Sequence, residues 1–321
     1  MNMKRISTYI LLLFILLITA SFYNPRVEKV ELKTVTGLND TVSYNFIKTT
    51  QLYAEHWDTL TQPTFWRILM NMHNDSAVIN IGSTRQIIQK ISVKEWDKIT
   101  DIDKDCYRDS VRCYYFLPEE TRIFVTTGRK FFYDFDNVMP TISRGIQVFK
   151  DNNVDPFYAQ AILLIESPNK LQKSNTGAYG SFQIMKDVAV HLGLKINKHE
   201  DERKDFDKSA WAAAKLIRTI CIPELNKILD NHCIEYNPTD IWYRLMVMHV
   251  YHAGAGNVRK VIDAINPSKG DMELITTLWQ TEAGGFKNAS QNYSQLVLAS
   301  ILELDEIINQ RRSSLFTLKG E

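Results

Sequence analysis

Apolar and polar positions follow two different patterns along the chain, and the pattern changes near residue 136. Between residues 28 and 135, short runs rich in β-branched and aromatic residues alternate with amphipathic stretches, which is typical of a small α+β unit. The short runs predict strands at residues 30–33, 77–81, 114–117 and 122–127. The amphipathic stretches predict helices at residues 65–72 and 83–91.

Helical periodicity dominates after residue 136, and strand signals become rare. The chain contains neither an internal repeat nor a long low-complexity tract. We therefore expect a mainly α protein, in which a helical domain over residues 136–311 follows a small α+β domain over residues 28–135. No motif in the α+β domain indicates its role.

One predicted helix is apolar on nearly every face, as a helix in the centre of a domain is. Asp155-Pro156 supplies its start, because the Asp side chain can cap free N–H groups and proline is tolerated in the first turn. The apolar run at residues 159–165 ends at Glu166, and Pro168 forbids continuation. Burial and the negative end of the helix dipole should both raise the pKa of Glu166, which suits a catalytic acid. The alternative is a structural glutamate bonded to backbone or to an arginine.

A glycine-punctuated turn follows this helix at residues 174–185. Gly177 and Gly180 permit close backbone approach, and Ser181 and Gln183 offer polar side chains. Such a loop can line a groove beside the helix that carries Glu166.

These blocks resemble the soluble lytic transglycosylase family and, more distantly, goose-type lysozyme. The resemblance covers residues 150–300 and rests on several ordered blocks. The matching text is Asp155-Pro156, Ile165-Glu166-Ser167, Ser174, residues 176–185, residues 201–214 and Val250-Tyr251-His252-Ala253-Gly254-Ala255-Gly256-Asn257-Val258.

The resemblance implies a lysozyme-like catalytic domain that cuts peptidoglycan glycan strands between N-acetylmuramic acid and N-acetylglucosamine. Glu166 would be the catalytic acid/base, and Ser167 would support it and the substrate N-acetyl group. Gln183 would line the saccharide groove together with Ser181, and Tyr251 would contact Glu166. His252, also expected in the groove, stands where the family has Asn.

A late block departs further from the family pattern. Glu282 is separated from Asn292-Tyr293 by an insert that contains Gly284-Gly285, so a role for Glu282 does not carry over.

No second carboxyl group accompanies Glu166, since the acids of the next forty residues fall mostly in a charged stretch. The family's solution is substrate assistance by the N-acetyl group, followed by closure of a 1,6-anhydro ring. Two alternatives stay open: a hydrolytic muramidase, and a glycan-binding module without activity.

The first 23 residues predict export, because Lys4 and Arg5 precede an apolar run at residues 9–18. The segment is expected to be a cleaved signal peptide or an N-terminal membrane anchor, and it lacks the cysteine of a lipoprotein. We therefore expect a periplasmic protein, or one anchored to the periplasmic face of a bacterial membrane. A formal charge of +1 gives no excess of basic residues that would indicate nucleic-acid binding.

The four cysteines form two close pairs, Cys106 with Cys113 and Cys221 with Cys233. In an exported chain these pairs predict two local disulfides. His249 and His252 have helical spacing, but no HExxH motif or nearby carboxylate completes a metal site, so we expect neither metal nor cofactor.

Overall fold

The computed structural model describes residues 31–317, except for residues 37–42, 134, 167–172 and 175. From Glu31 onward the chain forms one compact unit. Within the described part, no helix is long and apolar enough to cross a membrane. The predicted export segment, residues 1–23, lies outside that part.

A three-stranded antiparallel sheet forms the centre of the N-terminal region, with strand order β4-β3-β5. Successive residues of the central strand face opposite sides. Val78 packs on one side with residues of α3, and Ile79 and Ile81 pack on the other with Val111 of α5. The elements of this region are α2 (Thr50–Ala54), η1 (Trp57–Thr59), α3 (Thr61–Asn71), β3 (Ser76–Ile81), β4 (Ile87–Ser92), α4 (Val93–Trp96), α5 (Asp101–Tyr114) and β5 (Ile123–Thr127).

Most of the elements expected in this region are confirmed. The strands at residues 77–81 and 122–127 are β3 and β5, and the helix at residues 65–72 is the larger part of α3. The strand at residues 30–33 appears in its described part as β1 (Leu32–Thr36), which pairs with β2 (Ser43–Ile47).

Two predictions are wrong. Residues 83–91 are not a helix but the turn into β4 and most of that strand, because pairing with β3 outweighs the helix-like spacing of their isoleucines. Residues 114–117 are not a strand but the last residue of α5 and the turn that follows it.

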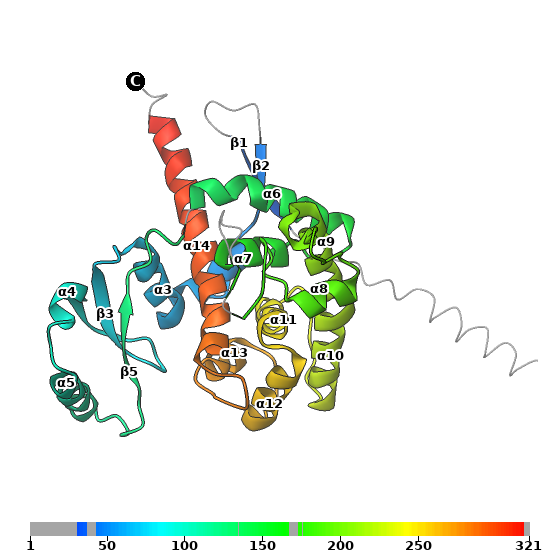
Figure 1. The fold of residues 1–321 in the computed structure, drawn as a ribbon. Helices are drawn as coiled ribbons and strands as arrows, with labels where there is room; N and C mark the ends of the chain where they lie inside the picture. The colour runs from blue at the N-terminus through cyan, green and yellow to red at the C-terminus, as the bar shows by residue number, and fades with distance from the viewer. Residues whose placement is uncertain (1–30, 37–42, 134, 167–172, 175, 318–321) are drawn as a thin grey trace, which may run out of the picture. The chain divides into compact units, whose positions relative to one another are not determined.

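The remainder of the chain is helical, as expected. Helix α7 lies at its centre with all nine residues buried, and it packs against α6, α11 and α14 (Figure 1). The elements are α6 (Phe135–Asp151), α7 (Phe157–Ile165), α8 (Lys186–Leu192), η2 (Glu202–Lys204), α9 (Phe206–Leu216), η3 (Ile217–Cys221), α10 (Ile222–Asn231), α11 (Ile241–Ala253), α12 (Ala255–Ile265), α13 (Met272–Leu278) and α14 (Asn288–Thr317).

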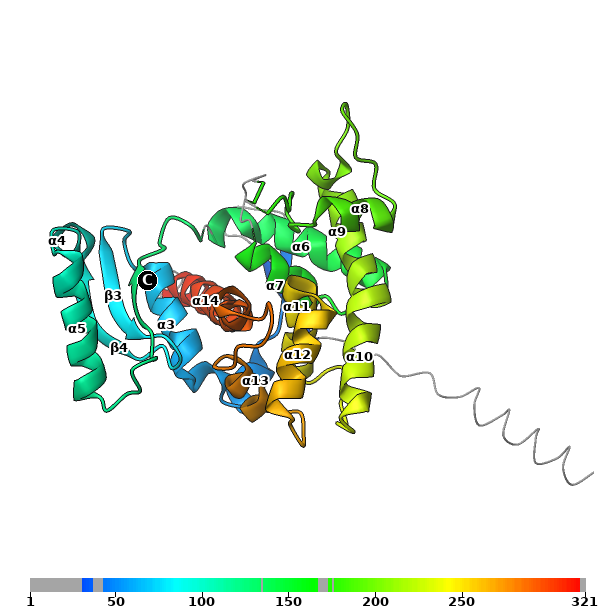
Figure 2. The same ribbon diagram turned by 60° about the horizontal axis from the view of Figure 1, so that its bottom comes forward.

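Helix α14 contacts both regions of the chain. It packs against α3 of the N-terminal region and against α7 and α11 of the helical region, and lies between them in Figure 2. Because this helix joins the two regions, the division into two domains at residue 136 stays a prediction.

The two predicted disulfides are wrong, since all four cysteines are free. Cys106 and Cys113 lie seven residues apart on α5, which separates them by about 10 Å along a helix axis, beyond the reach of a disulfide. Cys221 and Cys233 lie at opposite ends of α10, so the same reason applies to them with a larger separation.

Candidate active site

Asp155 caps the start of helix α7 and anchors it to a neighbouring helix. Oδ1 of Asp155 accepts a hydrogen bond from the backbone N–H of Phe157 at 2.8 Å, as its predicted capping role requires. Its Oδ2 accepts from Nε of Arg244 at 2.7 Å, an ion pair that ties α7 to α11. These contacts hold the helix, and therefore the residue at its far end, in a fixed position.

Glu166 caps the C-terminal end of α7 and is half-buried. Its Oε1 accepts a hydrogen bond from the hydroxyl of Tyr293 at 2.8 Å. Among the residues described, no arginine or lysine forms an ion pair with Glu166. Burial raises the pKa of Glu166 to about 7, and the bond from Tyr293 acts in the opposite direction. The carboxyl group is thus protonated in a substantial fraction of molecules at neutral pH, as a general acid requires.

The carboxyl group opens onto a pocket of about 270 Å³. Helix α11 contributes Tyr251 and His252 to the wall, and the loop after α7 contributes Gln183. The remaining lining residues are Ser174, Thr176, Ala178, Ile184, Met185, Val188 and Leu216. Among these described lining residues, Glu166 is the one carboxylate.

Gly180 makes the turn at residues 176–185 possible. Its φ is +84°, and a Cβ at this position would lie 2.0 Å from the carbonyl oxygen of Arg203. The buried Arg203 in turn donates from Nη1 to the carbonyl oxygens of Gly177 and Ile184, each at 3.0 Å. Its charge is balanced by Asp201 at 2.7 Å. Residues 176–185 are therefore held in place by these contacts, and several of them line the pocket.

The structure brings most of the predicted site residues together. Glu166, Gln183, Tyr251 and His252 all line the pocket. Ser181 is not among its lining residues, and Ser167 lies outside the described residues.

Tyr251 was expected to contact Glu166, and it lines the same pocket. Its hydroxyl donates to the carbonyl oxygen of Phe182 at 2.6 Å, so it supports the loop wall. It still lies close enough that the charge of Glu166 contributes to raising its pKa, after burial.

The tyrosine bonded to the acid, Tyr293, was not predicted as a site residue. It belongs to the late Asn292-Tyr293 block, which is similar to a block of the family. The insert before this block changes its spacing from Glu282, so Tyr293 could not be aligned with a site residue. The ring of His252 stacks on Tyr293 with centroids 4.2 Å apart and planes 20° from parallel. Burial lowers the pKa of His252 to about 4, so this ring is neutral at pH 7. Burial also dominates the raised pKa of Tyr133, about 12, to which Glu166 contributes.

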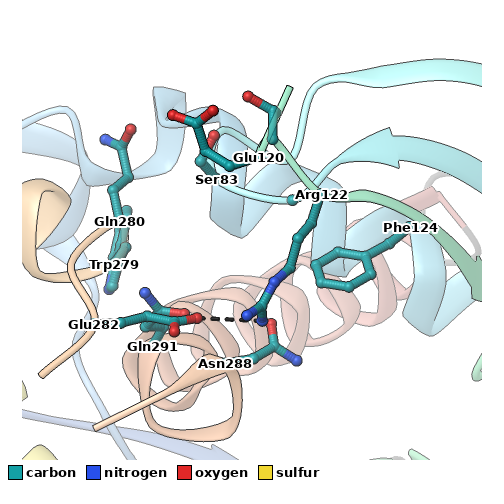
Figure 3. A pocket seen from close by; sticks show the side chains of 11 residues that line it. Ser83, Glu120, Arg122, Phe124, Trp279, Gln280, Glu282, Asn288 and Gln291 are labelled. Atoms are coloured by element: carbon teal, nitrogen blue, oxygen red, sulfur yellow. Dashed lines mark ion pairs between the residues drawn. The ribbon is translucent and has the colours of Figure 1, made fainter. Parts of the chain in front are cut away.

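Glu282 belongs to a different pocket, of about 360 Å³ (Figure 3). There its carboxylate pairs with Nη1 of Arg122 at 3.3 Å, which joins the start of β5 to the segment after α13. Glu282 is therefore an inter-region contact and does not line the pocket of Glu166.

His249 is a core residue. It is fully buried, and Ser294 lies 2.7 Å from its Nε2. The indole N–H of Trp279 donates to the same Ser294 hydroxyl at 2.7 Å, so these three side chains form one buried hydrogen-bonded group. Within the described residues, no group of His, Cys, Asp or Glu is arranged to hold a metal ion.

Residues 146–275 match the family model of the transglycosylase SLT domain. This segment is similar to that domain. This family consists of lytic transglycosylases and lysozyme-like proteins that cleave glycans. The matched segment includes every residue named above as lining the pocket of Glu166, whereas Tyr293 follows it. A comparison with curated proteins found no match.

Proposed function

We propose that this SLT-domain protein is a peptidoglycan lytic transglycosylase. It cleaves the β-1,4 bond between N-acetylmuramic acid and N-acetylglucosamine and leaves 1,6-anhydro-N-acetylmuramic acid ends. The observation that carries the proposal is Glu166, a carboxyl group with a pKa of about 7 that opens onto a pocket built by the SLT domain.

In the proposed reaction, Glu166 serves first as acid and then as base. Its proton passes to the glycosidic oxygen, the bond to the muramoyl C1 breaks, and the substrate's N-acetyl group stabilises the forming cation. The carboxylate that remains accepts the bond from Tyr293. It then removes the proton of the muramoyl C6 hydroxyl, whose oxygen bonds to C1. The proton returns to Glu166, and no water is consumed.

The remaining pocket residues serve the substrate. Gln183 can hydrogen-bond to sugar hydroxyl or acetamido groups from the loop wall. Tyr251 and the neutral His252 present aromatic surface beside the acid without adding charge to the pocket.

Product analysis tests the proposal. Purified sacculi are digested with the protein, and the products are separated and weighed by mass spectrometry. We expect non-reducing muropeptides one water lighter than their reducing counterparts. Reducing muropeptides alone would replace the transglycosylase with a hydrolytic muramidase.

Glu166→Gln separates an enzyme from a glycan-binding module. This variant keeps an oxygen that can accept from Tyr293 but has no proton to give, so we expect its digestion to be abolished. Glu235→Gln, at an exposed glutamate of the same domain, serves as the matched control and should digest at the parental rate. Clearing of sacculi by Glu166→Gln at the parental rate would show that the site is assigned wrongly.

We also propose that the first 23 residues export the protein to the compartment that holds its substrate, as a signal peptide or as a membrane anchor. Cell fractionation combined with determination of the N-terminal residue of the purified protein distinguishes the two. A protein found in the cytoplasm would contradict the proposal.

A further inference from the structure

Arg85 is a buried cation at the turn between β3 and β4, where 4% of its surface is exposed. Its guanidinium lies among the rings of Phe65, Trp66 and Phe124, at 5.3 to 5.6 Å from their centroids. Its backbone has a φ of +59°, a conformation that few residues other than glycine, asparagine and aspartate adopt. Within the described residues no carboxylate pairs with Arg85.

The guanidinium donates its hydrogen bonds to amide side chains. Nη1 donates to Oδ1 of Asn80 on β3 at 3.3 Å. Nη2 donates to Oδ1 of Asn288 at 2.9 Å and to Oδ1 of Asn292 at 2.5 Å. Asn288 and Asn292 are one turn apart at the start of α14. Arg85 therefore links the three-stranded sheet to the first two turns of α14.

This link lies next to the acid's partner in sequence, because Tyr293 follows Asn292 directly. The two side chains leave α14 about 100° apart, so one face of the turn holds Arg85 while another presents the tyrosine hydroxyl to Glu166. A small rotation of the turn about the helix axis would move that hydroxyl away from Oε1.

We propose that Arg85 is a positioning residue for the SLT site: by holding Asn288 and Asn292, it sets the rotation of α14 at which Tyr293 reaches Glu166. The inference rests on the proposed function and gives the α+β region a part in it. Apolar packing between α3 and α14 resists separation of the two helices, but rotation is resisted by directional hydrogen bonds.

A buried guanidinium without an acid destabilises the folded state, and burial lowers the pKa of Arg85 to about 10. It stays charged at neutral pH, so its bonds to the amides are charge-assisted.

Arg85→Met tests the inference, with Arg67→Met as the matched control. Arg67 of α3 also binds α14, through Glu303 and Glu306, but these partners lie ten or more residues beyond Tyr293. We measure initial rates of sacculus digestion from pH 5 to 9, and melting temperatures. Arg85→Met should lower the rate about fivefold, the effect of losing one hydrogen bond, and should move the basic limb of the pH–rate profile to higher pH. Arg67→Met should lower the melting temperature and leave the profile unchanged.

Among the described residues, the remaining titratable groups that face Glu166 are Tyr133, Tyr251 and His252, and both variants leave them unchanged. A shift therefore reports on the bond from Tyr293. In a Tyr293→Phe background, Arg85→Met should move the limb no further. Arg85→Lys, which retains a charged donor, should give a profile between those of the parent and Arg85→Met.

A parental profile for Arg85→Met, with a lowered melting temperature, would reduce Arg85 to a structural residue and overturn the inference. The proposed function would still stand if Glu166→Gln is inactive, and both fall if it is active. Should Arg85→Met fail to fold, Asn292→Ala removes the same bond while leaving Arg85 in place. It must then move the basic limb in the same direction, or the inference is overturned.

Discussion

The hydroxyl of Tyr293 donates a hydrogen bond to Oε1 of Glu166 at 2.8 Å across 127 residues of sequence. Burial and this bond act on the acid in opposite directions. Burial raises the pKa of Glu166 to about 7 and is the larger effect, while the bond stabilises the carboxylate and lowers the pKa. The pair therefore sets the pH range in which the acid can give its proton.

Tyr293→Phe should move the basic limb of the pH–rate profile upward. In the parent, digestion should fall as the pH rises through about 7, because the proton of Glu166 is lost there. Without the hydroxyl the pKa of Glu166 rises, so the protonated form persists to higher pH. The maximal rate should fall about fivefold, since the bond also stabilises the carboxylate that forms as the proton leaves. Initial digestion rates from pH 5 to 9 measure both effects.

Tyr243→Phe is the control for this experiment. It removes another tyrosine hydroxyl, one bonded to Asn226 at 2.6 Å and outside the lining of the pocket of Glu166. Its profile should keep the parental limb. A downward shift in Tyr293→Phe would show that the bond favours the protonated acid.

Glu166→Gln should stabilise the protein above neutral pH. A carboxyl group whose pKa is higher in the folded than in the unfolded state costs nothing below pH 4.5, where both states are protonated. The loss of unfolding free energy grows between pH 4.5 and about 7, and it reaches its full value above pH 7. The free energy of unfolding should therefore differ little between variant and parent at pH 4, and by at most about 3 kcal/mol at pH 8. Urea unfolding at the two pH values measures this, and an equal difference at both would contradict it.

Gly180→Ala should damage the loop wall far more than Gly177→Ala. At Gly180 the new Cβ would meet the carbonyl oxygen of Arg203 at 2.0 Å, in addition to the strain of a positive φ. We expect a loss of unfolding free energy of about 2 to 4 kcal/mol and a loss of digestion. At Gly177 the φ is +95°, but no described residue has an atom within 4 Å of the new Cβ, so the strain alone should cost about 1 kcal/mol. Thermal unfolding and digestion assays compare the two, and equal effects would contradict the prediction.

The four cysteines should all react as thiols, in two classes. Cys106, Cys113 and Cys233 are exposed and should be alkylated in the native protein. Cys221 is buried, and burial raises the pKa of its thiol to about 12, so it should react only after unfolding. Intact mass after iodoacetamide treatment counts the modified thiols. A native, unreduced protein that is two hydrogens lighter for each pair would show that disulfides form after all.

Local sequence determined the part of the site around Glu166. The signals are Asp155, the apolar run and Pro168, which lie within a few turns of one another. The observed bounds of α7 agree with them. The turn at Gly180 is local in the same sense, since its backbone conformation needs glycine. These features were predictable because few alternatives satisfy the same backbone constraints.

Long-range pairing explains what sequence reasoning missed. The isoleucines at residues 87, 88 and 91 suit either a helix or a strand, and pairing with β3 decides for the strand. The bond from Tyr293 depends on the return of α14 to α7, which no local pattern specifies. The assembly at Arg85 likewise needs a sheet and a helix more than 200 residues away in sequence, as the separation of 203 residues to Asn288 shows.

The position of α14 late in the chain has a consequence for the order of events during synthesis. The acid of α7 emerges from the ribosome well before its tyrosine partner, and the amides that receive Arg85 emerge at the same late stage. The complete set of contacts around Glu166 can therefore form only after α14 has packed against α7. Until then a growing chain carries the acid of α7 without the hydrogen bond from Tyr293 that lowers its pKa.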